Sequence, residues 1–473
     1  MPASAFFLAS DDYLVATNKS ASRKKSGARA ATASEAPSRG DLPHLAVECV
    51  TPEVDGGRYP VKRVVGDVVQ VGADIIKEGH DLMAARVRYR GPADSDWRHS
   101  PLTFDFEVDR WSGEFAVDSV GTWTFTVEAW TDRFRTWRGE LEKKVGAGQD
   151  VHSELLEGAE LVNRALGRMR FGQSRTALQR AVMILRDQHS SMDERVAVAL
   201  DRELLGHMDE HWVPDDLTTF RHELKVRVDR ERGRFASWYE FFPRSTSLEP
   251  GKHGTFRDSE WMLERAADLG FDVIYLPPIH PIGVSARKGR NNTLVAGPDD
   301  PGSPWAIGNE DGGHDAVDPR LGTIDDFDWF VKRANELELE IALDYALQCS
   351  PDHPWLKEHP EWFFVRPDGT IKYAENPPKK YQDIYPINFW SEDREGLWNA
   401  CRDVLLHWVD HGVRSFRVDN PHTKPFAFWE WVIAEVHQRH PDVIFFSEAF
   451  TRPKRLKLLA KLGFQQSYTY FTW

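Results

Sequence analysis

The feature that most constrains the fold is a pair of short apolar segments, each ending in an acidic residue. In the first, 412–421, apolar and polar residues alternate up to Asp419, and in the second, 443–449, the run ends in Glu448. Alternation with a period of two predicts strands, and the apolar spacing of residues 425–439 between them predicts a helix. Two strands joined by a helix lie parallel and adjacent, so both acids are expected at the same edge of a sheet.

The residues at these strand ends point to a particular chemistry. Arg417 precedes Asp419 by two residues, so both side chains share one face of the strand. A cation this close lowers the pKa of a carboxyl group, which suits a nucleophile. In glycosyl transfer one carboxylate attacks the anomeric carbon while a second carboxyl group protonates the leaving oxygen. A structural Arg–Asp ion pair perturbs pKa values in the same way, so this alternative stays open.

The composition narrows the class of protein. The formal net charge of −14 argues against nucleic acid as a partner, because such a partner requires a basic surface. There is no run of about 18 apolar residues, so no membrane span is expected. Cys49, Cys349 and Cys401 are too far apart for a disulfide framework or a zinc motif, so no metal or cofactor is expected. The 18 tryptophans fit a large core or platforms for sugar rings. We therefore expect a cytoplasmic enzyme.

The sequence pattern changes three times along the chain and predicts four parts. Residues 1–41 are rich in Ala, Ser, Lys and Arg, which predicts a disordered extension. Residues 42–149 contain short alternating runs between turn residues, which predicts an all-β, immunoglobulin-like sandwich. Residues 150–234 are charged with helical spacing, which predicts a small insertion of two or three helices. In residues 235–473 strands alternate with helices, which predicts a (β/α)8 barrel.

About six of the eight barrel strands are expected in this last part. Helices are predicted at 258–269 and 394–410, each followed by a glycine that can end it. The connections after the second and third strands are long, and long loops in a compact domain are usually functional. The predicted strands are 236–242, 273–276, 340–344, the two acid-tipped segments and 468–473.

Six segments of the barrel part carry longer motifs. They are Trp-Tyr-Glu at 238–240 with Phe-Pro-Arg-Ser at 242–245, Pro-Pro-Ile-His-Pro-Ile-Gly at 277–283, Arg-Lys-Gly-Arg-Asn-Asn at 287–292, Ala-Leu-Asp-Tyr-Ala-Leu-Gln-Cys-Ser-Pro at 342–351, Asn-Pro-Pro-Lys-Lys-Tyr-Gln-Asp at 376–383, and residues 416–425. With these motifs the chain resembles the α-amylase superfamily and, within it, the family of bacterial α-1,4-glucan:maltose-1-phosphate maltosyltransferases. The order of the preceding β and helical parts also fits that family.

The resemblance implies a role for each matching residue. Asp419 would be the nucleophile and Glu448 the general acid and then the base, with Arg417 beside them. The sugar would be contacted by Lys288, Asn292, Gln348, Asp383 and Asn420. The phosphate of the donor would be held by Asn376, Lys379 and Tyr381. The implied substrates are α-maltose-1-phosphate and an α-1,4-glucan acceptor, and the implied assembly is a homodimer.

Several of these residues also have simpler interpretations. Lys288 and Lys379 lie among other charges or prolines, as solvated loop residues do. Asp344 would be a structural partner of the nucleophile, and His314 a residue that staples a loop. An α-amylase-like hydrolase would share both acids but not the phosphate-binding loop. A non-catalytic glucan-binding module would use the β domain and the tryptophans.

The sequence departs from the superfamily pattern in two places. The strand-three motif usually closes with Asn-His, whereas Gln348 and Cys349 follow Asp344 here, which suits the maltosyltransferases. The chain stops at Trp473, before the family's third acid on strand seven and its C-terminal β domain. We therefore expect a C-terminally truncated chain that is inactive or unstable alone.

Overall fold

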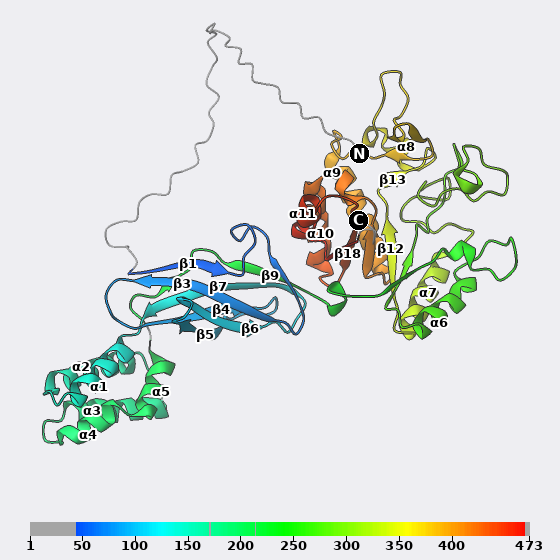
Figure 1. Cartoon of the computed structure of the whole chain (residues 1–473). Coiled ribbons are helices and arrows are strands. Elements are labelled where there is room, and N and C mark those ends of the chain that lie inside the picture. The colour runs from blue at the N-terminus through cyan, green and yellow to red at the C-terminus, as the bar shows by residue number, and fades with distance from the viewer. Residues whose placement is uncertain (1–43, 170–171, 213, 469–473) are drawn as a thin grey trace, which may run out of the picture. The chain divides into compact units, whose positions relative to one another are not determined.

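The computed structural model describes residues 44–169, 172–212 and 214–468 (Figure 1). The predicted disordered extension, 1–41, and the end of the predicted sixth strand lie outside the described residues. None of the described helices is long and apolar enough to cross a membrane.

The N-terminal part is a nine-stranded sheet around its own apolar core. Its strands are antiparallel except for the pair β2–β9, and the hydrogen-bonded order is β1-β3-β6-β5-β4-β7-β9-β2, with β8 on β7. The longest strand, β7, buries Trp123, Phe125 and Val127 on one face, as its alternating sequence predicts. The strands are β1 (Leu45–Thr51), β2 (Val61–Val64), β3 (Val68–Lys77), β4 (Met83–Arg90), β5 (Arg98–Asp105), β6 (Arg110–Ala116), β7 (Gly121–Thr131), β8 (Thr218–Thr219) and β9 (Leu224–Asp229).

The helical insertion differs from the prediction at both of its ends. Its first helix begins directly after β7, where the Asp132 side chain caps it, so helix replaces the sandwich predicted up to 149. Residues 224–229, predicted to be helical, return to the sheet as β9. The insertion contains more helices than the two or three predicted, and residues 196–205, for example, are divided between two helices because Asp201 caps a new one. The helices are α1 (Arg133–Gly146), α2 (His152–Gly167), α3 (Gln173–Arg186), α4 (Met192–Ala199) and α5 (Arg202–His211).

The C-terminal part contains six parallel strands in the order β10-β11-β12-β17-β18-β19. Because neighbours in the sheet are also consecutive along the chain, with a helix between each pair, the arrangement is that of a partial (β/α)8 barrel. The strands are β10 (Trp238–Glu240), β11 (Val273–Leu276), β12 (Glu340–Tyr345), β17 (Ser415–Val418), β18 (Ile444–Glu448) and β19 (Gln466–Tyr468). The connecting helices are α6 (Glu260–Asp268), α7 (Ile324–Glu336), α9 (Arg394–Asp410), α10 (Phe426–Arg439) and α11 (Pro453–Leu462).

The long connection after β12 contains small elements of its own. It carries β13 (Gln348–Cys349), which pairs with β16 (Tyr385–Pro386), and a hairpin of β14 (Ala374–Asn376) and β15 (Lys379–Tyr381). One helix, α8 (Trp355–Glu358), lies between them. Short 3-10 turns complete the part: η1 (Glu231–Gly233), η2 (Pro243–Ser245), η3 (Arg257–Ser259), η4 (Arg290–Asn292), η5 (Pro360–Trp362) and η6 (Pro421–Thr423).

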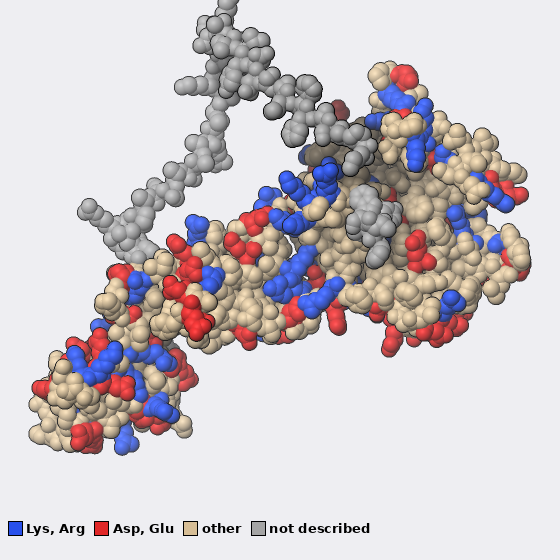
Figure 2. All heavy atoms as spheres, in the orientation of Figure 1, with Lys and Arg blue, Asp and Glu red and all other residues tan. Residues whose placement is uncertain are grey.

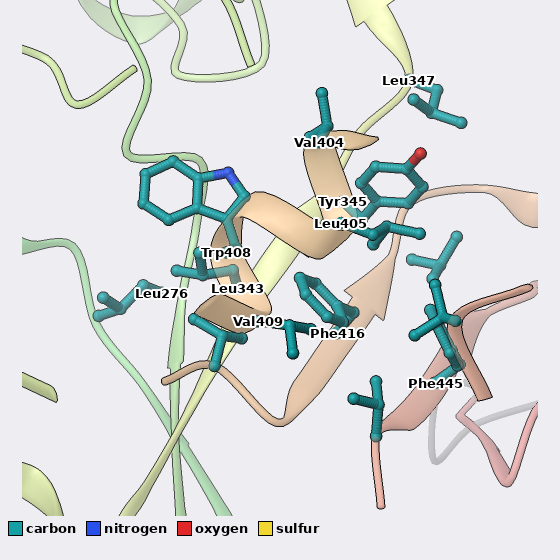
Figure 3. Close-up of a cluster of buried hydrophobic side chains, with 14 of the residues drawn as sticks. Leu276, Leu343, Tyr345, Leu347, Val404, Leu405, Trp408, Val409, Phe416 and Phe445 are labelled. Atoms are coloured by element: carbon teal, nitrogen blue, oxygen red, sulfur yellow. The ribbon is translucent and has the colours of Figure 1, made fainter. Parts of the chain in front are cut away.

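The two faces of the barrel strands have different surroundings, since one packs against the helices and the other lines the interior of the barrel. Figure 3 shows Leu405 of α9 close to Phe416 of β17 and Trp408 of α9 beside Leu343 of β12, and these side chains belong to one buried cluster. Phe416 is 1% exposed, so its burial contributes about 1.5–3 kcal/mol to folding. Since side chains alternate along a strand, Ser415 and Arg417 point the other way, into the barrel. The packing of α9 therefore fixes which side chains face the interior.

Candidate functional site

The register of the sheet brings the predicted acids to one place. Asp344 on β12 pairs with Arg417 on β17, and Arg417 pairs with Phe446 on β18. These positions therefore share the inner face of the barrel, and Glu448, two residues beyond Phe446, shares it too. Asp419 follows the end of β17, where its N–H donates to the Tyr345 carbonyl over 3.1 Å. The predicted meeting of the two acid-tipped strands at one sheet edge is confirmed.

Arg417 connects three carboxyl groups at this edge. Its Nη1 donates to Asp344 Oδ2 over 2.8 Å and to Asp419 Oδ1 over 3.1 Å. Its Nη2 donates to Glu448 Oε1 over 2.6 Å. Because the guanidinium is planar and rigid, these bonds fix the carboxyl groups relative to one another.

Two tyrosines hold Arg417 in this orientation. The guanidinium carbon lies 5.7 Å from the ring centre of Tyr275 and 5.9 Å from that of Tyr468. The Tyr468 hydroxyl also accepts a bond of 2.9 Å from Arg417 Nε. Burial disfavours the charged form of Arg417, but the carboxylates around it raise its pKa, so the cation is permanent.

The surroundings shift the pKa values of the two predicted catalytic acids in opposite directions. Burial by itself raises the pKa of Asp419, but Lys424, a hydrogen bond with Glu448 and Arg417 together hold that pKa below its ordinary value. Burial and the hydrogen bond to Asp419 raise the pKa of Glu448 to about 8. At neutral pH one carboxyl group is therefore ionised and its neighbour protonated, the division of labour that a nucleophile and a general acid need.

The turn after β17 adds donors around both acids. Asn420 takes the left-handed backbone conformation, with φ 43°, which asparagine tolerates better than most residues. Its Nδ2 donates to Asp419 Oδ1 over 3.2 Å, and its backbone N–H donates to Glu448 Oε2 over 3.4 Å. Asn420 makes both bonds, and it therefore lies beside the two acids.

Asp344 lies behind the pair and is nearly inaccessible, with 3% of its surface exposed. Its Oδ2 accepts bonds from the Tyr275 hydroxyl over 2.6 Å, from Trp305 Nε1 over 3.2 Å and from Arg417. Burial raises its pKa to about 6. This geometry fits the expected role as a partner of the charged cluster.

A cleft of about 970 Å³ opens above these carboxyl groups. Nine of the predicted site residues line it: Asn292, Gln348, Asn376, Tyr381, Asp383, Arg417, Asp419, Asn420 and Glu448. Figure 2 shows acidic and basic residues interspersed on the face that it draws, and the lining of the cleft also contains both signs of charge.

Two predicted lysines lie outside the lining of this cleft. Lys379 is exposed on β15, so the structure agrees with its interpretation as a solvated loop charge. Lys288 is only 7% exposed, which disagrees with that interpretation. Its ammonium group lowers the pKa of the nearby Asp383 carboxyl group. Burial of Asp383 outweighs this effect, so the pKa of Asp383 is raised. Asp383 is itself buried, and its Oδ1 has no partner among the described residues.

The buried group His314, Cys349 and His353 is close enough to suggest a metal centre. The Trp355 N–H donates to His353 Nδ1 over 3.1 Å, so the proton of that ring lies on Nε2. Nε2 then donates to His314 Nδ1 over 3.0 Å, which leaves His314 Nε2 to donate to the Ala346 carbonyl over 2.9 Å. All four ring nitrogens are thus used, and His314 staples its loop as expected rather than presenting a metal ligand.

The sequence did not single out four residues that complete the site. Tyr275, Trp305 and Tyr468 hold Arg417 and Asp344 from neighbouring elements, and Lys424 donates to the Asp419 carbonyl over 3.1 Å. Tyr275 could have been found, because it pairs with Ala342 on β12 and therefore shares the inward face with Asp344, two residues further along that strand. Trp305 comes from a loop, whose path the local sequence does not determine.

The partial parallel barrel with an Arg-linked carboxyl pair at its strand ends agrees with the resemblance to the α-amylase superfamily. A family model described as α-1,4-glucan:maltose-1-phosphate maltosyltransferase, domain N/S, matches residues 43–230. Among solved structures, an α-amylase from Lactobacillus plantarum is 31% identical over 46% of each chain, with a TM-score of 0.39.

Three relatives carry the name α-1,4-glucan:maltose-1-phosphate maltosyltransferase. The protein from Myxococcus xanthus is 53% identical over 90% of this chain and 65% of its own length. The first of two Streptomyces coelicolor proteins is 51% identical over 94% and 65%. The one from Cereibacter sphaeroides is 48% identical over 91% and 71%. The chain belongs to the α-1,4-glucan:maltose-1-phosphate maltosyltransferase family, and it spans 65% of the length of the Myxococcus relative.

Proposed function

We propose that the protein moves maltosyl units from α-maltose-1-phosphate to the non-reducing 4-hydroxyl end of an α-1,4-glucan and releases phosphate. The observation that carries this proposal is the meeting of Asp419 and Glu448 on the Arg417 guanidinium, at 3.1 Å and 2.6 Å, and the opposite directions of their pKa shifts agree with it. The names of the relatives supply the substrates.

The first chemical step is attack by Asp419. A carboxylate oxygen forms a bond to the anomeric carbon while the bond from that carbon to the phosphate oxygen breaks. Glu448 gives its proton to the departing phosphate, so the products are a β-maltosyl ester of Asp419 and inorganic phosphate. The Arg417 cation keeps Asp419 ionised until it attacks.

The second step reverses these roles. Glu448, now ionised, takes the proton from the 4-hydroxyl of the acceptor as that oxygen attacks the anomeric carbon and displaces Asp419. Two inversions at one carbon retain the α configuration. Transfer prevails over hydrolysis only where the acceptor, rather than water, occupies the cleft beside the ester.

The remaining predicted residues are assigned to binding. We assign contacts with the disaccharide to Lys288, Asn292, Gln348, Asp383 and Asn420, and contacts with the phosphate to Asn376, Lys379 and Tyr381. All of these except the two lysines line the cleft above the acids. Amide, hydroxyl and ammonium donors suit a dianionic leaving group.

Phosphate release tests the proposed reaction. The full-length protein, given α-maltose-1-phosphate and a short maltooligosaccharide, is expected to release phosphate and lengthen the acceptor by two glucose units per turnover. Hydrolysis of starch without phosphate release from the donor would instead identify an amylase-like hydrolase. Binding of glucan without turnover of either substrate would identify a non-catalytic module.

The β14–β15 hairpin offers a second test, because the resemblance places the phosphate contacts there. Tyr381→Phe removes one hydroxyl from the cleft wall. We expect it to lower kcat/KM for α-maltose-1-phosphate about tenfold, the effect of one lost hydrogen bond to a charged group, while uncharged α-maltosyl fluoride reacts at the wild-type rate. An equal loss of kcat/KM with both donors would show that the hairpin does not bind the phosphate.

The resemblance also supports proposals about the protein as a whole. We propose a homodimer that works in the cytoplasm. We further propose that the nine-stranded sheet is an immunoglobulin-like domain, and that the helical insertion and barrel are separate domains. Light scattering of the purified protein tests the first of these, with a mass of one chain as the contradicting result.

A further inference from the structure

Lys424 lies at the floor of the cleft, although the roles proposed above do not use it. It ends the η6 turn that follows Asp419, and its Nζ donates to the Asp419 carbonyl oxygen over 3.1 Å. Among the described residues this carbonyl is its only hydrogen-bond acceptor. An ammonium group has three donors, and Lys424 lines the cleft, so the remaining N–H groups are available to a bound molecule.

The charges of the side chains around Asp419 at the floor of the cleft sum to zero only if the Lys424 ammonium is included. The carboxyl groups are those of Asp344, Asp419 and Glu448, and the cations are Arg417 and Lys424. With Glu448 protonated, two carboxylates face two cations. Removal of the ammonium would leave a net negative floor, which would repel a dianionic donor but not an uncharged one.

We propose that Lys424 is a positioning and specificity-determining residue for the proposed transfer. It fixes the turn that carries Asp419, and it supplies the charge that lets the cleft accept a phosphorylated donor. The inference rests on the proposed function and extends it to the selection of the donor.

Lys424 also sets the ionisation of the nucleophile. The Lys424 charge lowers the pKa of Asp419, together with the hydrogen bond to Glu448 and the Arg417 guanidinium. The other titratable or charged groups that face this pair are Asp344 from β12, Arg417 from β17, His422 from η6, Glu448 from β18 and Tyr468 from β19. Arg417 remains in a Lys424 variant, so Asp419 keeps one cationic partner and the variant keeps measurable activity.

The experiment compares two donors and two substitutions in the full-length protein. Lys424→Met removes the charge and keeps the length of the side chain, whereas Lys424→Arg keeps the charge. Lys357→Met is the matched control, because Lys357 is exposed on α8 and does not line the cleft. Values of kcat/KM are measured against pH with α-maltose-1-phosphate and with uncharged α-maltosyl fluoride.

The expected result separates charge from structure. Lys424→Met should lose about tenfold more activity with the phosphate donor than with the fluoride, and its acid limb should move up by about one pH unit, the effect of losing a nearby opposite charge. Lys424→Arg and Lys357→Met should keep the wild-type donor preference. Equal losses with both donors and an unmoved acid limb would overturn the inference.

A second neutral variant and the activity of the wild type keep the test decisive. Where Lys424→Met does not fold, Lys424→Gln provides the neutral variant and is read in the same way. A wild-type protein that reacts with neither donor contradicts the proposed function itself. An active wild type together with a Lys424 variant that keeps its donor preference and its acid limb contradicts only this inference.

Discussion

At the scale of single residues, the site depends on one buried guanidinium with three carboxyl partners. Lysine carries the same charge on a single ammonium, which cannot reproduce the fixed fork that joins Asp344, Asp419 and Glu448. We expect Arg417→Lys to lower kcat by roughly 10²-fold or more, because the acids lose their fixed orientation. Steady-state kinetics with α-maltose-1-phosphate checks this. Arg439→Lys, at the exposed end of α10, is the control and should remain at the wild-type rate.

The pH dependence of the reaction belongs to the same scale. Glu448 must be protonated to act as an acid, and its pKa is raised to about 8, so activity should fall as the pH rises through about 8. Asp419 must be ionised, and Lys424, Glu448 and Arg417 together hold its pKa below the usual range of an aspartate, so the acid limb should lie below that range as well. A profile of kcat/KM against pH checks both limbs. Glu448→Gln should abolish the basic limb, and a limb that survives would assign the acid to another residue.

At the scale of elements, α9 and β17 position the site through their packing. Phe416 and Trp408 lie in the buried cluster on the helix side of the sheet, which leaves Arg417 on the inner side (Figure 3). Phe416→Ala should lower the free energy of unfolding by about 3–5 kcal/mol, because it creates a cavity in a packed core. Urea titration measures the change. Phe106→Ala removes a ring that is 89% exposed, and it should change the free energy by less than about 0.5 kcal/mol.

The elements also show how much the sequence could predict. Strand 273–276 and helix 394–410 were predicted with the bounds that the structure has, because the apolar run of the strand and the apolar period of the helix with its following glycine are local signals. Helix α1 was missed, since it follows β7 with only Asp132 between them and the sandwich pattern was extended through it. Strand β9 was missed because its partner β7 lies far away in the sequence.

Only part of the candidate site could be predicted from the sequence, for the same reason. Arg417, Asp419 and Glu448 follow from strand alternation and the crossover rule, which depend on nearby residues. The contacts of Tyr468 and Trp305 join elements more than 35 residues apart along the chain. Lys424 was part of a recognised motif, yet its bond to the Asp419 carbonyl depends on the left-handed turn at Asn420. No period in the sequence indicates that turn.

At the scale of the whole molecule, the chain joins a nine-stranded sheet and a group of helices to the partial barrel that contains the candidate site. The family model matches 43–230, and the proposed catalytic residues all lie beyond that range. We therefore expect that activity and oligomeric state can be altered separately. Arg417→Lys should leave the mass measured by light scattering at that of the wild type. A change in mass with this variant would show that the barrel site and the assembly are coupled.

The central claim is that Asp419 carries the sugar during the reaction, and trapping that ester tests it most directly. Glu448→Ala protein is incubated with α-maltosyl fluoride, whose leaving group needs no acid, while the missing base slows breakdown of the ester. Mass spectrometry of the digested protein should find one added maltosyl unit on the peptide containing Asp419. An unmodified Asp419 peptide, or the same mass on another residue, would contradict the account.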